Sequence, residues 1–304
     1  MDEMISQFPD HLTPKADEEL CHCPIAAERE AFEHPRDFFQ NKYVYLVISS
    51  RAGGLSVGVN LNPVMRCTFN CVYCEVDRTQ SPRIPVLDVD RMAVELRRTL
   101  DLAKKGKLRQ LPFYKNLSPD LLEVRHVALS GDGEPTLCGQ FVEAVQGVVH
   151  LRAMGKLFKM VLITNSTSLD RPEVLAGLKY FTRDDEVWAK LDGGTQDYIN
   201  RVNGSPFPLG KILNNILSVG KRRPVVIQSL FPLINGEEPS EKEILEYAQR
   251  LKELKDEGAE ISSVQIYSAT RPMALKGCSH LSLKQLSAIA SVVRKVTKLN
   301  AEVF

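Results

Sequence analysis

The sequence lacks the features of membrane, secreted and nucleic-acid-wrapping proteins. No uninterrupted apolar stretch approaches the roughly 18 residues of a membrane span, so no membrane association is expected. The first residues, MDEMISQFPD, are acidic and have no basic segment followed by an apolar core, which predicts no secretory signal. Lys and Arg number 39 against 38 Asp and Glu, and this formal charge of +1 indicates no large basic surface for RNA or DNA.

Cysteine is scarce and unevenly placed. The 304 residues include seven cysteines, an odd number, at positions 21, 23, 67, 71, 74, 138 and 278. A secreted disulfide scaffold would be shorter and more evenly studded with cysteine. We therefore expect a cytoplasmic location, where clustered thiols more often bind metal or carry out redox chemistry than form disulfides.

Apolar segments alternate with helix-length patterns along most of the chain. A polar extension broken by prolines is expected at 1–42 and one α/β domain at 43–304. Strands are predicted at 43–48, 55–61, 124–129, 160–164, 187–191, 225–230 and 264–267, and helices at 89–105, 140–154, 171–178, 208–219, 241–254 and 283–296. Short, continuously apolar strands separated by single helices are typical of βαβ units in a parallel sheet. About six such units fit either an open doubly wound sheet or an incomplete barrel, and both bind ligands at the carboxyl ends of their strands.

Three cysteines lie close together directly after the second predicted strand. Cys67, Cys71 and Cys74 have the spacing Cys-x3-Cys-x2-Cys. Thiolates are soft ligands that suit zinc or iron–sulfur clusters. A zinc site would need a fourth ligand from elsewhere in the chain, and three buried, inert thiols are the structural alternative. Three thiolates on a cubane cluster leave one iron open to an outside ligand, which favours catalysis over electron transfer alone.

With Tyr73 before the last cysteine, this loop resembles that of the radical S-adenosylmethionine (SAM) superfamily. The resemblance implies a partial (β/α)6 barrel in which Cys67, Cys71 and Cys74 hold a [4Fe-4S] cluster and Tyr73 belongs to the cofactor site. It further implies that SAM chelates the open iron and is cleaved by one electron to a 5′-deoxyadenosyl radical, which abstracts hydrogen from a substrate. An electron donor such as a flavodoxin or ferredoxin is then the expected partner. The sequence identifies neither the substrate nor a residue that acts on it.

A second motif, Gly131-Asp132-Gly133-Glu134, follows the third predicted strand. Taken alone it is equally consistent with a turn, and its glycine spacing is not that of a dinucleotide-binding loop. It resembles the Gly-Gly-Glu motif of the same superfamily, which binds the amino group of SAM. The resemblance assigns that contact to Glu134, with Asp132 as its candidate helper.

Polar residues also follow later predicted strands, where ligands of parallel sheets bind. Each could instead cap or form a turn, and Lys190 could simply pair with Asp192. By resemblance, Asn165, Ser166 and Asp192 are candidates for contacts with the methionine carboxylate and the ribose. Tyr267 and Ser268 are candidates to border the adenine.

Further segments resemble the iron–sulfur oxidoreductases related to wyosine-base synthesis on tRNA. These segments are 58–61, 130–137, 190–193, 199–201 and 271–272. The wyosine enzymes carry additional N-terminal cysteines for a second cluster, whereas this chain has only Cys21 and Cys23 upstream, either as part of an auxiliary metal site or as ordinary thiols. Because the charge is near neutral, tRNA is an alternative substrate that we do not favour. A non-catalytic iron–sulfur or zinc protein is the other alternative, although such a protein needs no SAM-binding motif.

Overall fold

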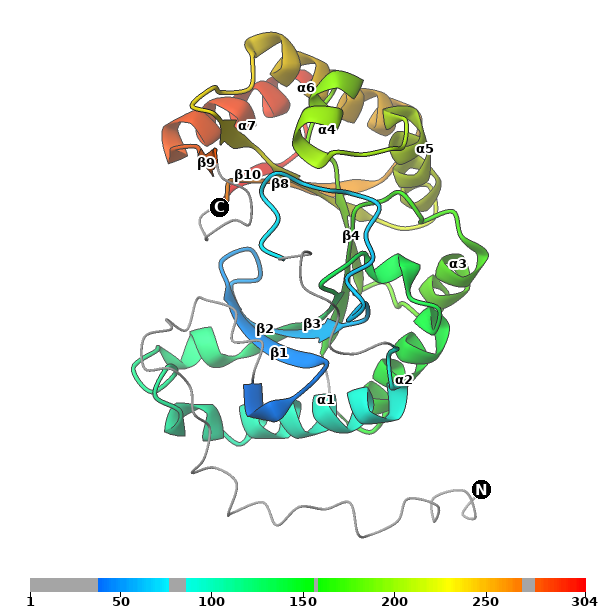
Figure 1. Cartoon of the computed structure of the whole chain (residues 1–304), viewed down its shortest axis with the longest axis vertical. Helices are drawn as coiled ribbons and strands as arrows, with labels where there is room; N and C mark the ends of the chain where they lie inside the picture. The colour runs from blue at the N-terminus through cyan, green and yellow to red at the C-terminus, as the bar shows by residue number, and fades with distance from the viewer. Residues whose placement is uncertain (1–37, 77–85, 156–157, 270–276) are drawn as a thin grey trace.

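The computed structural model describes residues 38–76, 86–155, 158–269 and 277–304 (Figure 1). Most of the predicted 1–42 extension, including Cys21 and Cys23, lies outside the described residues. Arg271 and Pro272 of the wyosine-like segments also lie outside them.

The described elements follow the predicted alternation of strands and helices. The strands are β1 (Val44–Ser49), β2 (Gly54–Asn60), β3 (Val124–Ser130), β4 (Lys159–Thr164), β5 (Glu186–Lys190), β6 (Val225–Leu230), β7 (Pro232–Ile234), β8 (Ile261–Tyr267), β9 (Cys278–His280) and β10 (Ala301–Val303). The α-helices are α1 (Val89–Lys104), α2 (Phe141–Ala153), α3 (Pro172–Leu178), α4 (Gln196–Asn203), α5 (Leu209–Gly220), α6 (Glu241–Asp256) and α7 (Leu283–Thr297). Short 3-10 helices cover Phe38–Gln40, Lys107–Gln110, Pro119–Leu122 and Pro135–Leu137. Of these, α4, β7, β9, β10 and the 3-10 helices were not predicted.

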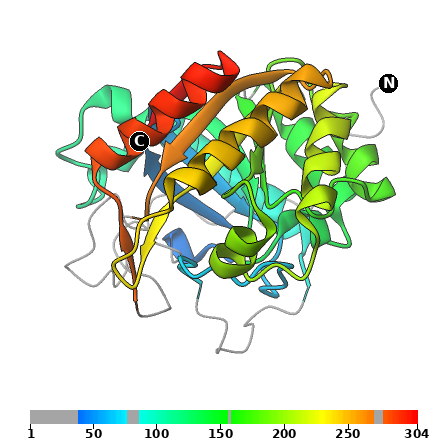
Figure 2. The ribbon, with the colours of Figure 1, turned by 90° about the horizontal axis from the view of Figure 1, so that it is seen from above.

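One eight-stranded sheet has the order β1-β2-β3-β4-β5-β6-β8-β10 and is parallel except for the antiparallel pair β1–β2. Strands β2, β3, β4, β5, β6 and β8 are each followed by a helix, which confirms the six predicted β/α units. Neighbouring strands in the sheet follow the order of the chain, so the right-handed crossover connections place the helices on one face of the sheet. The sheet curls with its concave face away from these helices (Figures 1 and 2). The fold is therefore the partial barrel, since a doubly wound sheet reverses its strand order.

Local sequence accounts for where several helices begin. Asp88, Thr195, Ser240 and Ser282 precede α1, α4, α6 and α7, and each side chain accepts a hydrogen bond from the backbone N–H three residues on. Strands β2 and β6 are buried along their whole length, as expected for strands covered on both faces. Among the described residues, none of the helices combines the length and apolar character that crossing a bilayer requires.

The two faces of the curled sheet bury different apolar residues. Met160 and Leu162 of β4 belong to the main core, whereas the alternate residues Val161 and Ile163 belong to a smaller cluster with Trp188 and Val226. Residues alternate between the faces of a strand, so this smaller cluster lies on the concave inner face. Ile163 also lines the cavity described below, which connects this inner packing to the candidate site.

Candidate functional site

The cysteine loop leaves the end of β2 and is held first by Asn62. The Asn62 side-chain amide donates to the carbonyl of Arg66 at 2.8 Å and to that of Glu134 at 2.7 Å. Its oxygen accepts from the Arg66 N–H at 3.2 Å, and the Glu134 N–H donates to the Arg66 carbonyl at 2.8 Å. One buried asparagine thus ties the cysteine loop to the second motif.

The other side of the loop rests on the C-terminal end of α4. The N–H groups of Asn70 and Val72 donate to the carbonyls of Asn203 and Val202 at 2.7 and 2.9 Å. These are orphan carbonyls of the last helical turn, which otherwise need water or a cap. Gly204 ends the helix with φ +52°, and a Cβ there would lie 3.0 Å from the Asn70 carbonyl oxygen. Helix α4 therefore positions the loop between Cys67 and Cys74.

Side-chain amides approach two of the three cysteine sulfurs. The Asn203 Nδ2 lies 3.3 Å from the Cys71 Sγ, and the Asn165 Nδ2 lies 3.6 Å from the Cys67 Sγ. Cys71 is buried, and this burial together with the nearby Asp192 raises the pKa of its thiol to about 12. Metal binding must therefore displace a tightly held proton from Cys71. Soft sulfur ligands with amide N–H donors beside them fit an iron–sulfur cluster.

No three Cys, His, Asp or Glu side chains in the described part of the chain converge on one point as ligands of a single metal ion do. Thiolates that hold a cubane cluster each bind a different iron. The cluster assigned to Cys67, Cys71 and Cys74 therefore stays a prediction.

Asp192 lies at the centre of a buried network behind the loop. Tyr73 donates its hydroxyl hydrogen to Asp192, and the Asn203 amide donates to the same carboxylate at 2.7 Å. The backbone N–H of Leu230 donates to its other oxygen at 2.8 Å, and the Lys190 ammonium lies 3.3 Å away. Burial and the Asp192 charge both raise the pKa of Tyr73, so its hydroxyl stays protonated. The network fixes Tyr73 against β5, and the ribose contact predicted for Asp192 remains untested.

The buried carboxylate of Glu134 accepts four hydrogen bonds within the protein, three at Oε1 and one at Oε2. It accepts hydrogen bonds from the hydroxyls of Thr164 and Thr136 at 2.5 and 2.6 Å and from the N–H groups of Thr136 and Asn165 at 3.2 and 2.8 Å. Burial raises its pKa, and these four donors offset part of the rise. Glu134 therefore joins the second motif to the end of β4. The amino-group contact predicted for it stays a prediction.

Asp132 and the two glycines of the motif have different surroundings. The Asn60 side chain donates to the Asp132 carboxylate at 2.8 Å and accepts from the Asp132 N–H at 3.1 Å. Gly131 and Asp132 line the cavity described below. A Cβ on Gly133 would lie only 2.1 Å from the Arg66 carbonyl oxygen, so the motif backbone packs directly on the cysteine loop.

Asn165 and Ser166 follow β4 but face different ways. The Asn165 amide donates to the Thr68 hydroxyl at 2.7 Å and faces the cysteine loop. Ser166 is buried with φ +68°, and its hydroxyl donates to the Lys190 carbonyl at 3.4 Å. The structure thus brings Asn165 beside the loop and directs Ser166 toward the end of β5.

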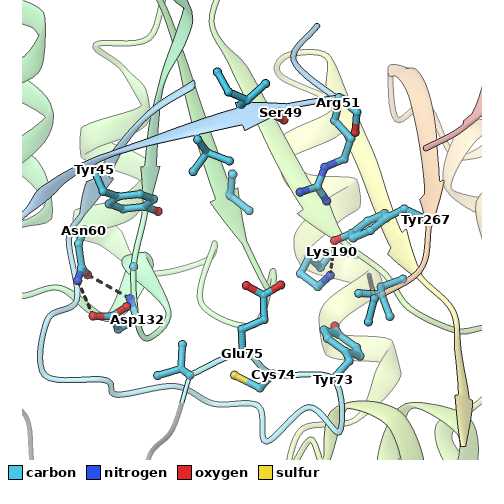
Figure 3. Close-up of a pocket in the computed structure, with 18 of the residues that line it drawn as sticks. Tyr45, Ser49, Arg51, Asn60, Tyr73, Cys74, Glu75, Asp132, Lys190 and Tyr267 are labelled. Carbon is cyan, nitrogen blue, oxygen red and sulfur yellow. Dashed lines mark hydrogen bonds between the residues drawn. The ribbon is translucent and has the colours of Figure 1, made fainter. Parts of the chain in front are cut away.

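A cavity of about 480 Å³ opens beside these residues (Figure 3). Its wall includes Tyr73, Cys74, Gly131 and Asp132 from the predicted site. The remaining predicted site residues are not part of this wall, and they are Cys67, Cys71, Gly133, Glu134, Asn165, Ser166 and Asp192. Tyr267 and Ser268, the predicted adenine neighbours, also line the cavity.

Sequence reasoning missed Asn62 and Asn203, which support the cysteine loop. Asn203 could have been found from the Thr195 cap, the apolar spacing of Tyr198, Ile199 and Val202, and the following glycine, which together indicate a short helix. Nothing local marks Asn62, because its role arises from its contact with Glu134 across the fold.

Comparisons with known proteins give one family model and several relatives. The family model described as Radical SAM superfamily matches residues 61–248. A UPF0026 protein from Synechocystis is 30% identical over 167 residues, which are 53% of this chain and 52% of that protein, so the chain spans about half of the relative's length.

Two solved structures share the fold. TYW1 with a lysine-pyruvate adduct bound has a TM-score of 0.52 at 18% identity and covers 83% of this chain and 84% of its own. SuiB from Streptococcus suis bound to SAM has a TM-score of 0.54 at 14% identity, covering 80% of this chain and 49% of its own. At these identities the likeness extends to the fold alone.

Proposed function

The chain belongs to the radical SAM superfamily, whose family model matches more than half of it, and from that premise we propose the cofactors and reaction of this enzyme. Cys67, Cys71 and Cys74 hold a [4Fe-4S] cluster, and SAM binds in the adjoining cavity. When bound, the two groups supply one-electron cleavage of the sulfonium, and the resulting 5′-deoxyadenosyl radical takes a hydrogen atom from the substrate.

The cysteine loop and its supports carry this proposal. Asn62 anchors the loop to the second motif, α4 supports its other side, and Asn165 and Asn203 direct amide N–H groups at two sulfurs. A structural zinc site needs no amino-acid cradle beside it. Here the loop adjoins a cavity that also contains Gly131 and Asp132, as a cluster with a bound SAM requires.

We assign the amino group of SAM to the 131–134 motif, with the two acidic residues in different roles. Asp132 brings the carboxylate that lines the cavity and can accept from an ammonium group. Glu134 accepts hydrogen bonds from its own turn and from the end of β4 and does not line the cavity, so in our proposal it shapes the turn and Asp132 makes the direct contact. Asn165 and Ser166 are assigned to the methionine carboxylate, and Asp192, with Tyr73, to the ribose side.

A reduced flavodoxin or ferredoxin is the proposed electron donor. A wyosine-type reaction on tRNA is the alternative substrate class, supported by the likeness of fold to TYW1. The formal charge of +1 weighs against a large RNA surface.

The proposal is tested by anaerobic reconstitution with iron and sulfide, followed by dithionite and SAM. We expect 5′-deoxyadenosine from the wild-type chain and none from Cys71→Ala, because the cluster then lacks a thiolate and its support at Asn203. Cys278→Ala is the matched control, since Cys278 lies in β9, which pairs with β7, and is not one of the three loop cysteines; it should form product. A cluster-loaded wild type that forms no 5′-deoxyadenosine, or a fully active Cys71→Ala, would contradict the proposal.

A further inference from the structure

The cavity has two chemically different walls. Figure 3 shows Asp132 with Asn60 on one side and Arg51, Tyr267 and Lys190 on the other. Arg51 lies at the end of the cavity away from Cys74, with Tyr267 and Lys190 between them (Figure 3). The proposed SAM contacts account for the acidic wall, the Cys74 end and the ring of Tyr267 as an adenine neighbour, and they leave Arg51 and Lys190 without a role.

Tyr267 holds two cations against the cavity. The Arg51 guanidinium carbon lies 4.2 Å from the centre of its ring, and the Lys190 ammonium lies 5.3 Å from it. The Lys190 ammonium donates to the Tyr267 hydroxyl at 3.0 Å. Because that hydroxyl accepts from Lys190, its own hydrogen is left for another acceptor. Three donors from three elements, the β1–β2 turn, β5 and β8, thus meet at one place.

This wall carries two cations, Arg51 and Lys190. Lys190 is paired with Asp192 at 3.3 Å, whereas among the residues that the structure describes no carboxylate forms an ion pair with Arg51. Asp192 thus balances the Lys190 charge, whereas the Arg51 guanidinium faces a cavity whose lining also includes the carboxylates of Glu75 and Asp132.

Arg51 is held in place by its turn. The N–H of Gly53 donates to the Ser50 carbonyl at 3.0 Å, and the N–H of Ala52 donates to the Ser49 hydroxyl at 3.2 Å. Gly53 has φ +69°, a conformation that glycine adopts without strain. The turn fixes the Arg51 backbone, and the Tyr267 ring lies against its guanidinium, a group that can form paired hydrogen bonds with a planar or tetrahedral oxyanion.

We infer that Arg51, Lys190 and Tyr267 form a binding site for an anionic group, a carboxylate or a phosphate, on the substrate of this enzyme. The inference rests on the proposed function, because it assumes that SAM occupies the Cys74 end of the same cavity. An anionic group held at the Arg51 end of the cavity orients the rest of the substrate toward the Cys74 end. The enzyme's substrates are therefore expected among organic acids or phosphate esters.

The test uses the full chain loaded with its cluster and with SAM, kept oxidised so that no turnover occurs. Binding of radiolabelled inorganic phosphate and of radiolabelled acetate is measured by equilibrium dialysis at constant ionic strength. We expect one saturable site in the millimolar range, and the probe that binds more tightly identifies the anion. Arg51→Gln should weaken binding about 10- to 100-fold because a charge-assisted contact is lost.

Other variants separate charge from shape. Arg51→Lys keeps the charge and should weaken binding less than Arg51→Gln. Tyr267→Phe keeps the ring beneath Arg51 and removes only the hydroxyl, so a partial loss is expected. Arg222→Gln is the matched control, because Arg222 is exposed and precedes β6 at the opposite end of the strand, and it should bind as the wild type does.

Three results would overturn the inference. First, the wild type binds neither probe saturably. Second, Arg51→Gln binds the probes as tightly as the wild type does. Third, Arg51→Gln loses affinity for SAM by the same factor as for the anion, which would assign Arg51 to the carboxylate of the cofactor. Formation of 5′-deoxyadenosine by the wild type is measured separately. If it forms but neither anion binds, only this inference fails, whereas anion binding without 5′-deoxyadenosine would remove the proposed function and leave the anion site.

Discussion

Replacing Gly133 by alanine tests how the second motif supports the cysteine loop. The added Cβ would lie 2.1 Å from the Arg66 carbonyl oxygen and 2.7 Å from the Arg66 nitrogen, although real Cβ contacts under 3.0 Å essentially do not occur. The two backbones must therefore separate by about 0.9 Å or more. This would stretch the 2.8 Å hydrogen bonds that the Arg66 carbonyl accepts from the Glu134 N–H and the Asn62 amide.

The Gly133→Ala substitution should destabilise the fold both by overpacking and by weakening these two hydrogen bonds. The two effects together should lower the free energy of unfolding by about 2–5 kcal/mol. Urea unfolding of the cluster-free chain measures this loss, and iron content after reconstitution measures whether the displaced loop still holds a cluster. Gly139→Ala is the matched control, since nothing lies within 4 Å of a Cβ there. Gly133→Ala with wild-type stability and iron content would refute the packing argument.

Two further predictions concern the cluster environment and the barrel interior. Asn203→Leu removes the amide N–H donor beside Cys71, and such a donor stabilises the more negative, reduced cluster. The midpoint potential of the cluster should therefore fall by roughly 40 mV, equivalent to about 1 kcal/mol, in a redox titration monitored by EPR. An unchanged potential would leave Asn203 with a structural role only. Burial, with Lys159, lowers the pKa of His126 from 6.5 to about 4. As the pH falls, the imidazole therefore takes up a proton in the unfolded chain before it does so in the folded chain. Between pH 6.5 and 4 the free energy of unfolding of the wild type should fall by about 3 kcal/mol more than that of His126→Gln. The same pH dependence in both proteins would contradict this prediction.

The main strands and helices of the fold could be predicted because their signals are local. The apolar run 225–230 coincides with β6, since a strand buried on both faces needs apolar residues throughout. The pattern of strands and helices alone could not separate an open sheet from a barrel, because both have the same units and differ only in strand order. The resemblance of the cysteine loop favoured the barrel, and the strand order confirms it. Strands β7, β9 and β10 are three residues long, too short for any periodicity to appear.

The candidate site also contains residues that the sequence could identify and residues that it could not. The three cysteines could be identified because their spacing is itself the signal. The direction of the Glu134 carboxylate could not, because it depends on Thr164 and Asn165 at the end of a different strand. Arg51 was invisible for the same reason, since its partner Tyr267 lies more than 200 residues further along the chain.

The most direct test of the account is a Mössbauer spectrum of the chain reconstituted anaerobically with ⁵⁷Fe, recorded without and with SAM. We expect a four-iron cluster in which one iron changes its spectrum when SAM is added, because three protein thiolates leave that iron open. A mononuclear tetrahedral ion ligated by protein alone, or a cluster whose spectrum SAM leaves unchanged, would contradict the central claim.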